Sequence, residues 1–153
     1  MKKQRMTLGA ILEIEINKHK FCYAQILTEA DCAFFDYIGK ERLRDLSVLE
    51  TVEILFIVAV YQDVITNGKW IKVGKLPIRD DLKTKPMKFI QDAHDKSKFE
   101  LYNPNNGKIT KATKEECQGL EYAAVWEAKH VEERLEDHYN NKPNIWVERM
   151  KIK

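Results

Sequence analysis

Three ionisable side chains near the C-terminus have the spacing of a catalytic or metal-binding cluster. His130, Glu133 and Asp137 fall within about 60° of each other on a helical wheel, because each residue of an α-helix turns the chain by about 100°. An imidazole beside two carboxylates could hold a metal ion or transfer a proton during hydrolysis. The same pattern is typical of a solvated helix face with alternating charges, and this second interpretation is favoured.

A second candidate is the stretch TNGKWIKVGK at residues 66–75, which contains two Gly-Lys pairs. A phosphate-binding loop needs four residues between its glycines and a Ser or Thr after its lysine, because the hydroxyl binds magnesium. Here five residues separate Gly68 from Gly74, and Leu76 follows the second lysine. The stretch therefore does not fit a phosphate-binding loop.

The dipeptide Asn67-Gly68 instead predicts the two-residue turn of a β-hairpin, since both residues tolerate a positive φ. Pairing about this turn would place Ile65 opposite Trp70, an aromatic–aliphatic pair that helps to fix strand register. We therefore expect a hairpin here.

Charge and length limit the possible classes of function. The chain of 153 residues carries 26 basic and 24 acidic side chains, which gives a net charge of +2. So balanced a charge provides no strong field to attract nucleic acid or an anionic membrane. The apolar run after the basic start soon meets Glu13 and Glu15, which excludes a signal peptide, and no run approaches the roughly 20 residues of a membrane span. We expect a cytoplasmic protein.

The three cysteines, Cys22, Cys32 and Cys117, are odd in number and lack metal-binding spacing. Each lies in apolar sequence, so we expect buried, reduced thiols. No motif predicts a cofactor.

Apolar periodicity predicts strands more often than helices. Residues 9–17 alternate apolar and polar side chains, and residues 52–61 form an apolar run typical of a strand buried on both faces. Other candidate strands are residues 21–27, 32–38, 69–73, 87–91, 99–102, 120–126 and 144–152. We expect an α+β, mostly β architecture: a curled antiparallel sheet, open or closed to a barrel, with one or two helices packed on it. Residues 1–153 are expected to form a single domain.

One amphipathic helix is predicted over residues 127–139, with Val131 and Leu135 on its apolar stripe. A second, short helix is expected to begin at Thr113, because Thr113 and Glu116 have the spacing of a capping box.

The side chains of the first three predicted strands indicate which face of the sheet could bind a partner. Pairing the second and third around residues 28–31 assigns their side chains to two faces. One face would carry Leu12, Ile14, Ile16, Cys22, Ala24, Ile26, Ala33, Phe35 and Tyr37. The other would carry Glu13, Glu15, Phe21, Tyr23, Gln25, Phe34 and Asp36. The loop around residues 18–20 must then have an odd number of residues, because a shift by one would bury Glu13 and Glu15.

Two interpretations of the second face remain open. It could be a partly covered sheet, with Phe21 and Phe34 beneath a loop or helix. It could instead bind another protein, because aromatic side chains ringed by charge are typical of interfaces. The residues predicted to bind a partner are Glu13, Glu15, Tyr23, Asp36, Trp70 and Lys72.

Several short motifs occur in an order typical of one protein family. They are GKW and the following GK in 68–75, KFIQD at 88–92, ATKEE at 112–116, LEYAAVW at 120–126 and HVEERLEDHY at 130–139. From about Gly9 to Glu148 the chain resembles the immunity protein 26 family, except that Ala10 follows Gly9 where the family usually has Asp. The resemblance implies a small, mostly β protein of bacterial toxin–immunity loci that binds a cognate protein toxin. Some relatives are named HocA-type phosphotriesterases, which implies an enzymatic alternative.

The primary hypothesis is therefore an immunity protein that occludes a toxin and is not an enzyme. The alternative is a small metal-assisted hydrolase of the phosphotriester type that uses His130, Glu133 and Asp137. The alternative is disfavoured because a chain of 153 residues is too short for the barrel that usually performs this reaction, and because it lacks an H-x-H pair. An RNA-binding module is also disfavoured, since no basic groove accompanies the aromatic residues.

Overall fold

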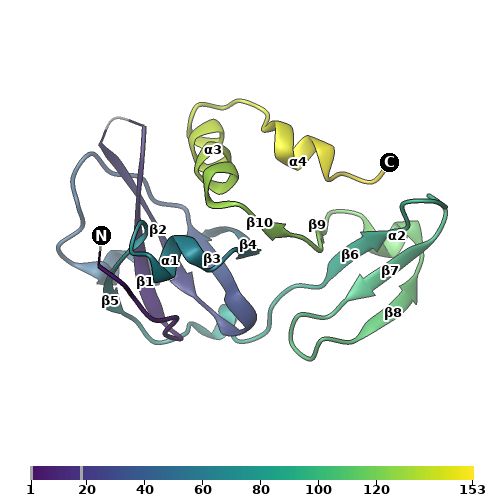
Figure 1. Cartoon of the computed structure of the whole chain (residues 1–153), viewed down its shortest axis with the longest axis horizontal. Coiled ribbons are helices and arrows are strands. Elements are labelled where there is room, and N and C mark those ends of the chain that lie inside the picture. The colour runs from purple at the N-terminus through teal and green to yellow at the C-terminus, as the bar shows by residue number, and fades with distance from the viewer. Residues whose placement is uncertain (1, 18) are drawn as a thin grey trace.

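Two β-sheets and four helices make up the part of the chain that the structure describes, residues 2–17 and 19–153. The structure is a computed structural model, and its architecture is α+β and mostly β, as predicted (Figure 1). The strands are β1 (Ala10–Ile16), β2 (Lys20–Ile26), β3 (Asp31–Phe35), β4 (Ile54–Val60), β5 (Ile71–Lys75), β6 (Lys88–Gln91), β7 (Phe99–Tyr102), β8 (Ile109–Ala112), β9 (Glu121–Tyr122) and β10 (Val125–Trp126). The helices are α1 (Asp63–Thr66), α2 (Lys114–Cys117), α3 (Ala128–Tyr139) and α4 (Ile145–Arg149), with 3-10 turns η1 (Thr28–Ala30), η2 (Leu46–Glu50) and η3 (Asp80–Leu82). Neither sheet closes into a barrel within these residues.

The first sheet has the strand order β10-β4-β3-β2-β1-β5 and lies on the left in Figure 1. All of its pairs are antiparallel except β10 with β4. Ile14 pairs with Cys22, and Ile16 with Lys20, so three residues separate these two strand ends. This is the odd loop that the alternating pattern predicted, although Lys18 within it lies outside the described residues.

The predicted faces of β3 are wrong by one residue. Phe34 lies in the main core and Phe35 lies on the opposite face of the sheet. The turn before β3 contains the three residues of η1 instead of the predicted four, because the Leu27 N–H donates to the Asp31 carbonyl oxygen at 2.8 Å. A turn shortened by one residue moves every side chain of the following strand to the other face.

The main core lies between the first sheet and α3, the helix predicted from the apolar stripe. Val131 and Leu135 of α3 are fully buried against apolar side chains of the sheet such as Ile14 and Phe34. Burial of such a stripe, more than intrinsic propensity, stabilises a helix of this length. The prediction of α3 is confirmed.

The opposite face of the sheet is covered by the segment 37–52, which runs over it and includes η2. Tyr23, Phe35 and Leu49 form a second buried cluster there, together with Phe21. The covered-sheet interpretation is therefore confirmed for Phe21.

The predicted hairpin at Asn67-Gly68 is wrong. Residues Asp63–Thr66 form the single turn α1, and Gly68 follows it with a φ of +83° and donates its N–H to the Ile65 carbonyl oxygen at 3.0 Å. A glycine with positive φ commonly ends a helix, so the same dipeptide signal fits either structure. The helical turn buries Val64 and Ile65. Strand β5 therefore pairs with β1 and not with the residues before the turn.

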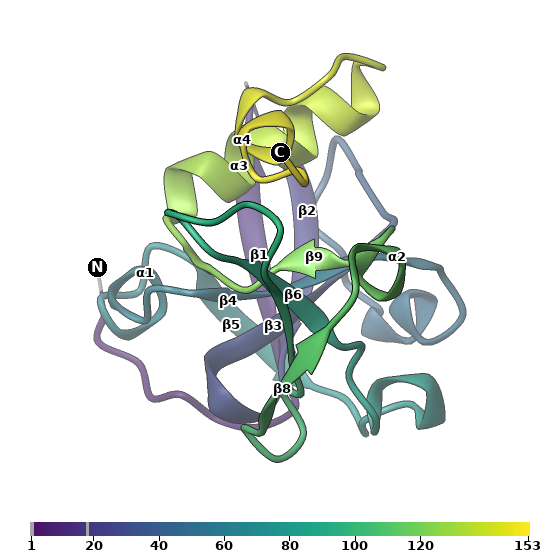
Figure 2. The ribbon, with the colours of Figure 1, turned by 90° about the vertical axis from the view of Figure 1, so that its right-hand side faces the viewer.

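The second sheet has the order β8-β7-β6-β9 and faces the viewer in Figure 2, with the first sheet behind it and α3 and α4 above. The predicted strand 120–126 is divided between the sheets: β9 pairs with β6, and β10 pairs with β4. The chain thus crosses from one sheet to the other between Tyr122 and Val125. The short helix expected at Thr113 is confirmed as α2, with both hydrogen bonds of its capping box.

The predicted strand at residues 144–152 is wrong, because this segment contains α4. The Asn144 side chain accepts hydrogen bonds from the backbone N–H groups of Trp146 and Val147, each at 3.1 Å, which starts a helix. Trp146 then packs on α3.

Two further expectations concern composition. All three cysteines are free and buried, as predicted, and burial raises the pKa of Cys22 and of Cys32 to about 12. Among the described residues, no helix combines the length and the apolar character needed to cross a membrane.

Candidate partner-binding site

Two of the six residues predicted to bind a partner, Glu13 and Tyr23, are buried together beneath the segment 37–52. The Tyr23 hydroxyl donates to Glu13 Oε2 at 3.0 Å, and Arg42 Nη1 donates to Glu13 Oε1 at 2.9 Å. The Leu43 N–H donates to the Tyr23 hydroxyl oxygen at 2.8 Å. Burial, with a smaller contribution from Glu13, raises the pKa of Tyr23 to about 12. These contacts hold the covering segment on the sheet.

Two other predicted residues contact opposite ends of α3. Trp70 is only 1% exposed, and its Nε1 donates to Glu132 Oε2 at 2.9 Å. Asp36 is exposed and accepts a hydrogen bond from the Tyr139 hydroxyl at 3.0 Å. Both residues therefore help to position α3 on the sheet.

The last two predicted residues have accessible side chains. Glu15 is exposed on the Phe21 face of the sheet, away from Asp36. Lys72 lies on the edge strand β5, and its Nζ donates to Thr7 Oγ1 at 2.7 Å. The structure thus joins Glu13 with Tyr23 and leaves the other four residues apart. A joint role in binding a partner stays a prediction.

The cluster His130, Glu133 and Asp137 holds α4 against α3. The His130 ring stacks on Trp146 with ring centroids 3.6 Å apart, and Trp146 Nε1 donates to Glu133 Oε2 at 2.7 Å. Asn144 Nδ2 donates to Asp137 Oδ2 at 2.9 Å. Within residues 2–17 and 19–153, no three or more His, Cys, Asp or Glu side chains are grouped so that they could hold a metal ion.

A cleft of about 330 Å³ lies between the two sheets and was not predicted from the sequence. We call it the inter-sheet cleft and define it by its lining residues in four segments: residues 54–57, 81–82, 86–88 and 119–121. Residues 54–57 belong to β4 of the first sheet, whereas Lys88 begins β6 of the second sheet and residues 119–121 lead into β9. The cleft therefore brings together segments that are far apart in the sequence.

One wall of the cleft is an unpaired strand edge. Strand β10 pairs only with Ala59 and Val60, so residues 54–57 have no strand partner on that side within the described chain. The Tyr61 N–H donates to the Trp126 carbonyl oxygen at 3.0 Å, towards β10. Because backbone groups alternate between the two edges of a strand, those of Ala59 and Ile57 share the edge of Tyr61. The backbone of Ile57 is thus directed towards the cleft.

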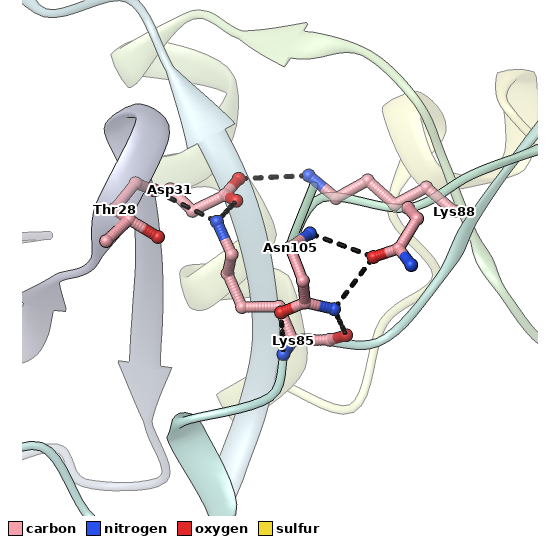
Figure 3. A network of polar contacts seen from close by, with 6 residues as sticks. Thr28, Asp31, Lys85, Lys88 and Asn105 are labelled. Atoms are coloured by element: carbon pink, nitrogen blue, oxygen red, sulfur yellow. Dashed lines mark hydrogen bonds and ion pairs between the residues drawn. The ribbon is translucent and has the colours of Figure 1, made fainter. Parts of the chain in front are cut away.

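A buried ionic network joins the two sheets beside the cleft (Figure 3). Asp31 of β3 accepts hydrogen bonds from Lys85 Nζ at 2.7 Å and from Lys88 Nζ at 3.0 Å. The Asp31, Lys85 and Lys88 side chains are 3%, 3% and 6% exposed. Asn105 supports the network, since its side chain accepts from the Lys85 N–H at 2.8 Å and donates to the Lys85 carbonyl oxygen at 2.9 Å. Lys88 lines the cleft, and Lys85 does not.

The two acidic side chains that line the cleft are each bound by an arginine. Arg134 of α3 donates to both carboxylate oxygens of Glu121, at 3.0 and 2.8 Å, and its guanidinium lies 3.7 Å from the Phe56 ring centroid. Arg79 donates to both oxygens of Asp81, at 3.0 and 2.6 Å. These hydrogen bonds hold the pKa of Asp81 below its usual value. Both carboxylates are thus neutralised within the chain.

Sequence reasoning missed Asp31, Lys85 and Lys88. The one available signal was the position of Asp31 at the start of an apolar run, where a carboxylate needs a partner once it is buried. The lysines are 54 and 57 residues away in the sequence and resemble ordinary surface lysines.

The chain is similar to one family of known proteins. The family model described as immunity protein 26 matches residues 7–100, which is more than half of the chain. The matched part includes β1 to β6 and all three members of the buried ionic network, whereas the motifs quoted above for residues 112–139 lie beyond it. No curated protein and no solved structure gives a significant match. The chain belongs to the immunity protein 26 family.

Proposed function

We propose that this protein neutralises a cognate protein toxin by binding it, and that the inter-sheet cleft is a main contact surface. Membership of the immunity protein 26 family is the observation that carries the proposal. In this proposal the protein covers a surface that the toxin needs, which requires a rigid, complementary face and no catalytic group.

The cleft fits such a role better than the residues predicted from the sequence. Its β4 edge offers unpaired backbone groups, and extended segments of partner proteins commonly add to such an edge. Leu55, Met87 and Leu120 are half-buried along its walls and could be covered further by a partner. The exposed Glu15 and the half-buried Lys72 of the predicted set remain an alternative contact surface at the β1–β5 side of the sheet. No observation favours the hydrolase alternative, since its three residues hold α4 in place.

Growth protection provides the test of this proposal. We expect the chain to restore growth of cells that express a toxin domain encoded beside its gene. Met87 lines the cleft but belongs to none of the core clusters, so Met87→Trp should fill the cleft and abolish protection. Val73→Trp on the edge strand β5, where Val73 is 38% exposed, is the matched control and should protect like the unmodified chain.

Two results would contradict the proposal. Failure of the unmodified chain to protect against that toxin domain would argue against the immunity function. Loss of protection in Val73→Trp, with full protection in Met87→Trp, would move the contact surface to the β1–β5 side. Thermal unfolding of both variants checks that each is folded.

A further inference from the structure

We propose that the inter-sheet cleft binds an extended segment that carries an acidic side chain, and that Lys88 pairs with its carboxylate. The inference deepens the proposed function, on which it rests for the identity of the partner as a protein. Two independent features of the cleft support it: an excess of buried positive charge, and the unpaired edge of β4.

The charged side chains that line the cleft are Asp81, Lys88 and Glu121, and the balance becomes positive when the side chains that bind them are included. Three carboxylates belong to its ionic contacts, and four cationic side chains face them. The carboxylates are Asp31, Asp81 and Glu121, and the cations are Arg79, Lys85, Lys88 and Arg134. Three negative against four positive groups leave a net charge of +1. The two arginines each bind one carboxylate completely, so the excess charge lies on the lysine pair that shares Asp31.

Within this pair, Lys88 is the member with unused hydrogen-bonding capacity. Its ammonium has three N–H donors, and Asp31 Oδ1 is its one acceptor among the described residues. Lys85 Nζ has two acceptors, Asp31 Oδ2 and the Thr28 carbonyl oxygen. A buried ammonium with free donors is costly, because it loses hydration that the protein does not replace. A carboxylate that enters the cleft would supply both the missing acceptor and the missing negative charge.

The edge of β4 determines the shape of the segment. An extended chain beside residues 54–57 can form backbone hydrogen bonds with Ile57, which already directs its backbone groups towards the cleft. Alternate side chains of such a segment point to the same side. One of them can therefore reach Lys88, while its neighbours contact apolar walls such as Leu55 and Leu120.

A peptide selection tests this inference without any toxin. The immobilised full-length protein is used to select binders from a random library of linear peptides displayed on phage. We expect the enriched peptides to share an Asp or Glu at one fixed position, flanked by apolar residues. Replacing that acid by its amide in a synthetic peptide should weaken the dissociation constant at least about tenfold, which corresponds to about 1.4 kcal/mol.

The matched pair of variants is Lys88→Met and Lys85→Met. Each removes one lysine from Asp31, but only Lys88 lines the cleft, so only Lys88→Met should lose the preference for the acid over its amide. Three results would overturn the inference: no enriched peptide, enriched peptides without a common acid, or an unchanged preference in Lys88→Met. The comparison of acid and amide peptides on the unmodified protein remains decisive if Lys88→Met does not fold. Since no toxin is used, this result is independent of the growth assay.

Discussion

Replacing Asp31 by asparagine is expected to lower the free energy of unfolding by about 3–5 kcal/mol, the usual effect of removing one member of a buried ionic network. The variant would leave the ammonium groups of Lys85 and Lys88 buried, each less than 7% exposed, without a counter-charge. Urea unfolding followed by tryptophan fluorescence measures this difference.

The control removes all of the charges together. In a variant that combines Asp31→Leu with Lys85→Met and Lys88→Met, apolar side chains replace all three buried charged groups. Replacement of a complete buried network by apolar groups is commonly neutral or stabilising, so most of the lost stability should return. A loss below about 1 kcal/mol for Asp31→Asn alone would show that the lysines reach water, and that the network is not buried in solution.

Trp70→Ala is expected to lower the free energy of unfolding by about 3–5 kcal/mol, as is usual when a large buried aromatic residue is truncated. The Trp70 ring contacts Phe34 edge-on, with ring centroids 5.9 Å apart, and its indole N–H is bonded to Glu132 of α3. The variant would therefore leave a cavity beneath α3 and remove the indole donor from Glu132, which keeps its ion pair with Lys69 at 3.7 Å. Chemical unfolding again provides the measurement.

A neighbouring residue of the same strand region supplies the control. Lys72→Ala should change the free energy of unfolding by no more than about 0.5 kcal/mol. Lys72 lies on the edge strand, and water can replace the ammonium as the donor of the hydrogen bond to Thr7. Equal, small effects of Trp70→Ala and Lys72→Ala would contradict the assignment of Trp70 to the core. They would also restore Trp70 as a candidate contact residue for a partner.

The elements that the sequence predicted correctly are those with a strong local pattern. The alternation in residues 9–17 and the apolar stripe of α3 are long enough to fix which side chains face the main core, although Glu13 on the opposite face is buried as well, beneath the segment 37–52. The wrong predictions concern short segments whose sequence fits two different local structures. Asn67-Gly68 suits a helix end as well as a hairpin, and residues 144–152 contain the helix α4, whose Trp146 contacts His130 and Glu133 of α3.

The candidate site depended on tertiary contacts that no local pattern specifies. Glu13 was predicted to be on a partner-binding face, but the segment 37–52 folds over that face and supplies Arg42 as its counter-ion. Asp31 was predicted to lie in a turn, yet it begins a strand and meets Lys88 of the other sheet. Residues so far apart in the sequence come into contact only in the folded protein, when both sheets are in place, so the sequence alone did not predict these pairs.

The buried ionic network has two consequences for the molecule as a whole. It joins Asp31 of the first sheet to Lys88 of the second, while the single domain expected for residues 1–153 stays a prediction. It also fixes the position of Lys88 beside the unpaired edge of β4. Contacts that hold the sheets together therefore also shape the proposed binding surface, so variants of Asp31 should affect both stability and partner binding.

Amide hydrogen exchange of the protein, free and bound to its toxin, tests whether the inter-sheet cleft is the contact surface. We predict slower exchange on binding in residues 54–57 and 119–121, which line the inter-sheet cleft, and no change in residues 71–75 of β5. Protection of residues 71–75, with unchanged exchange in residues 54–57 and 119–121, would show that the toxin binds at β5 and not at the inter-sheet cleft.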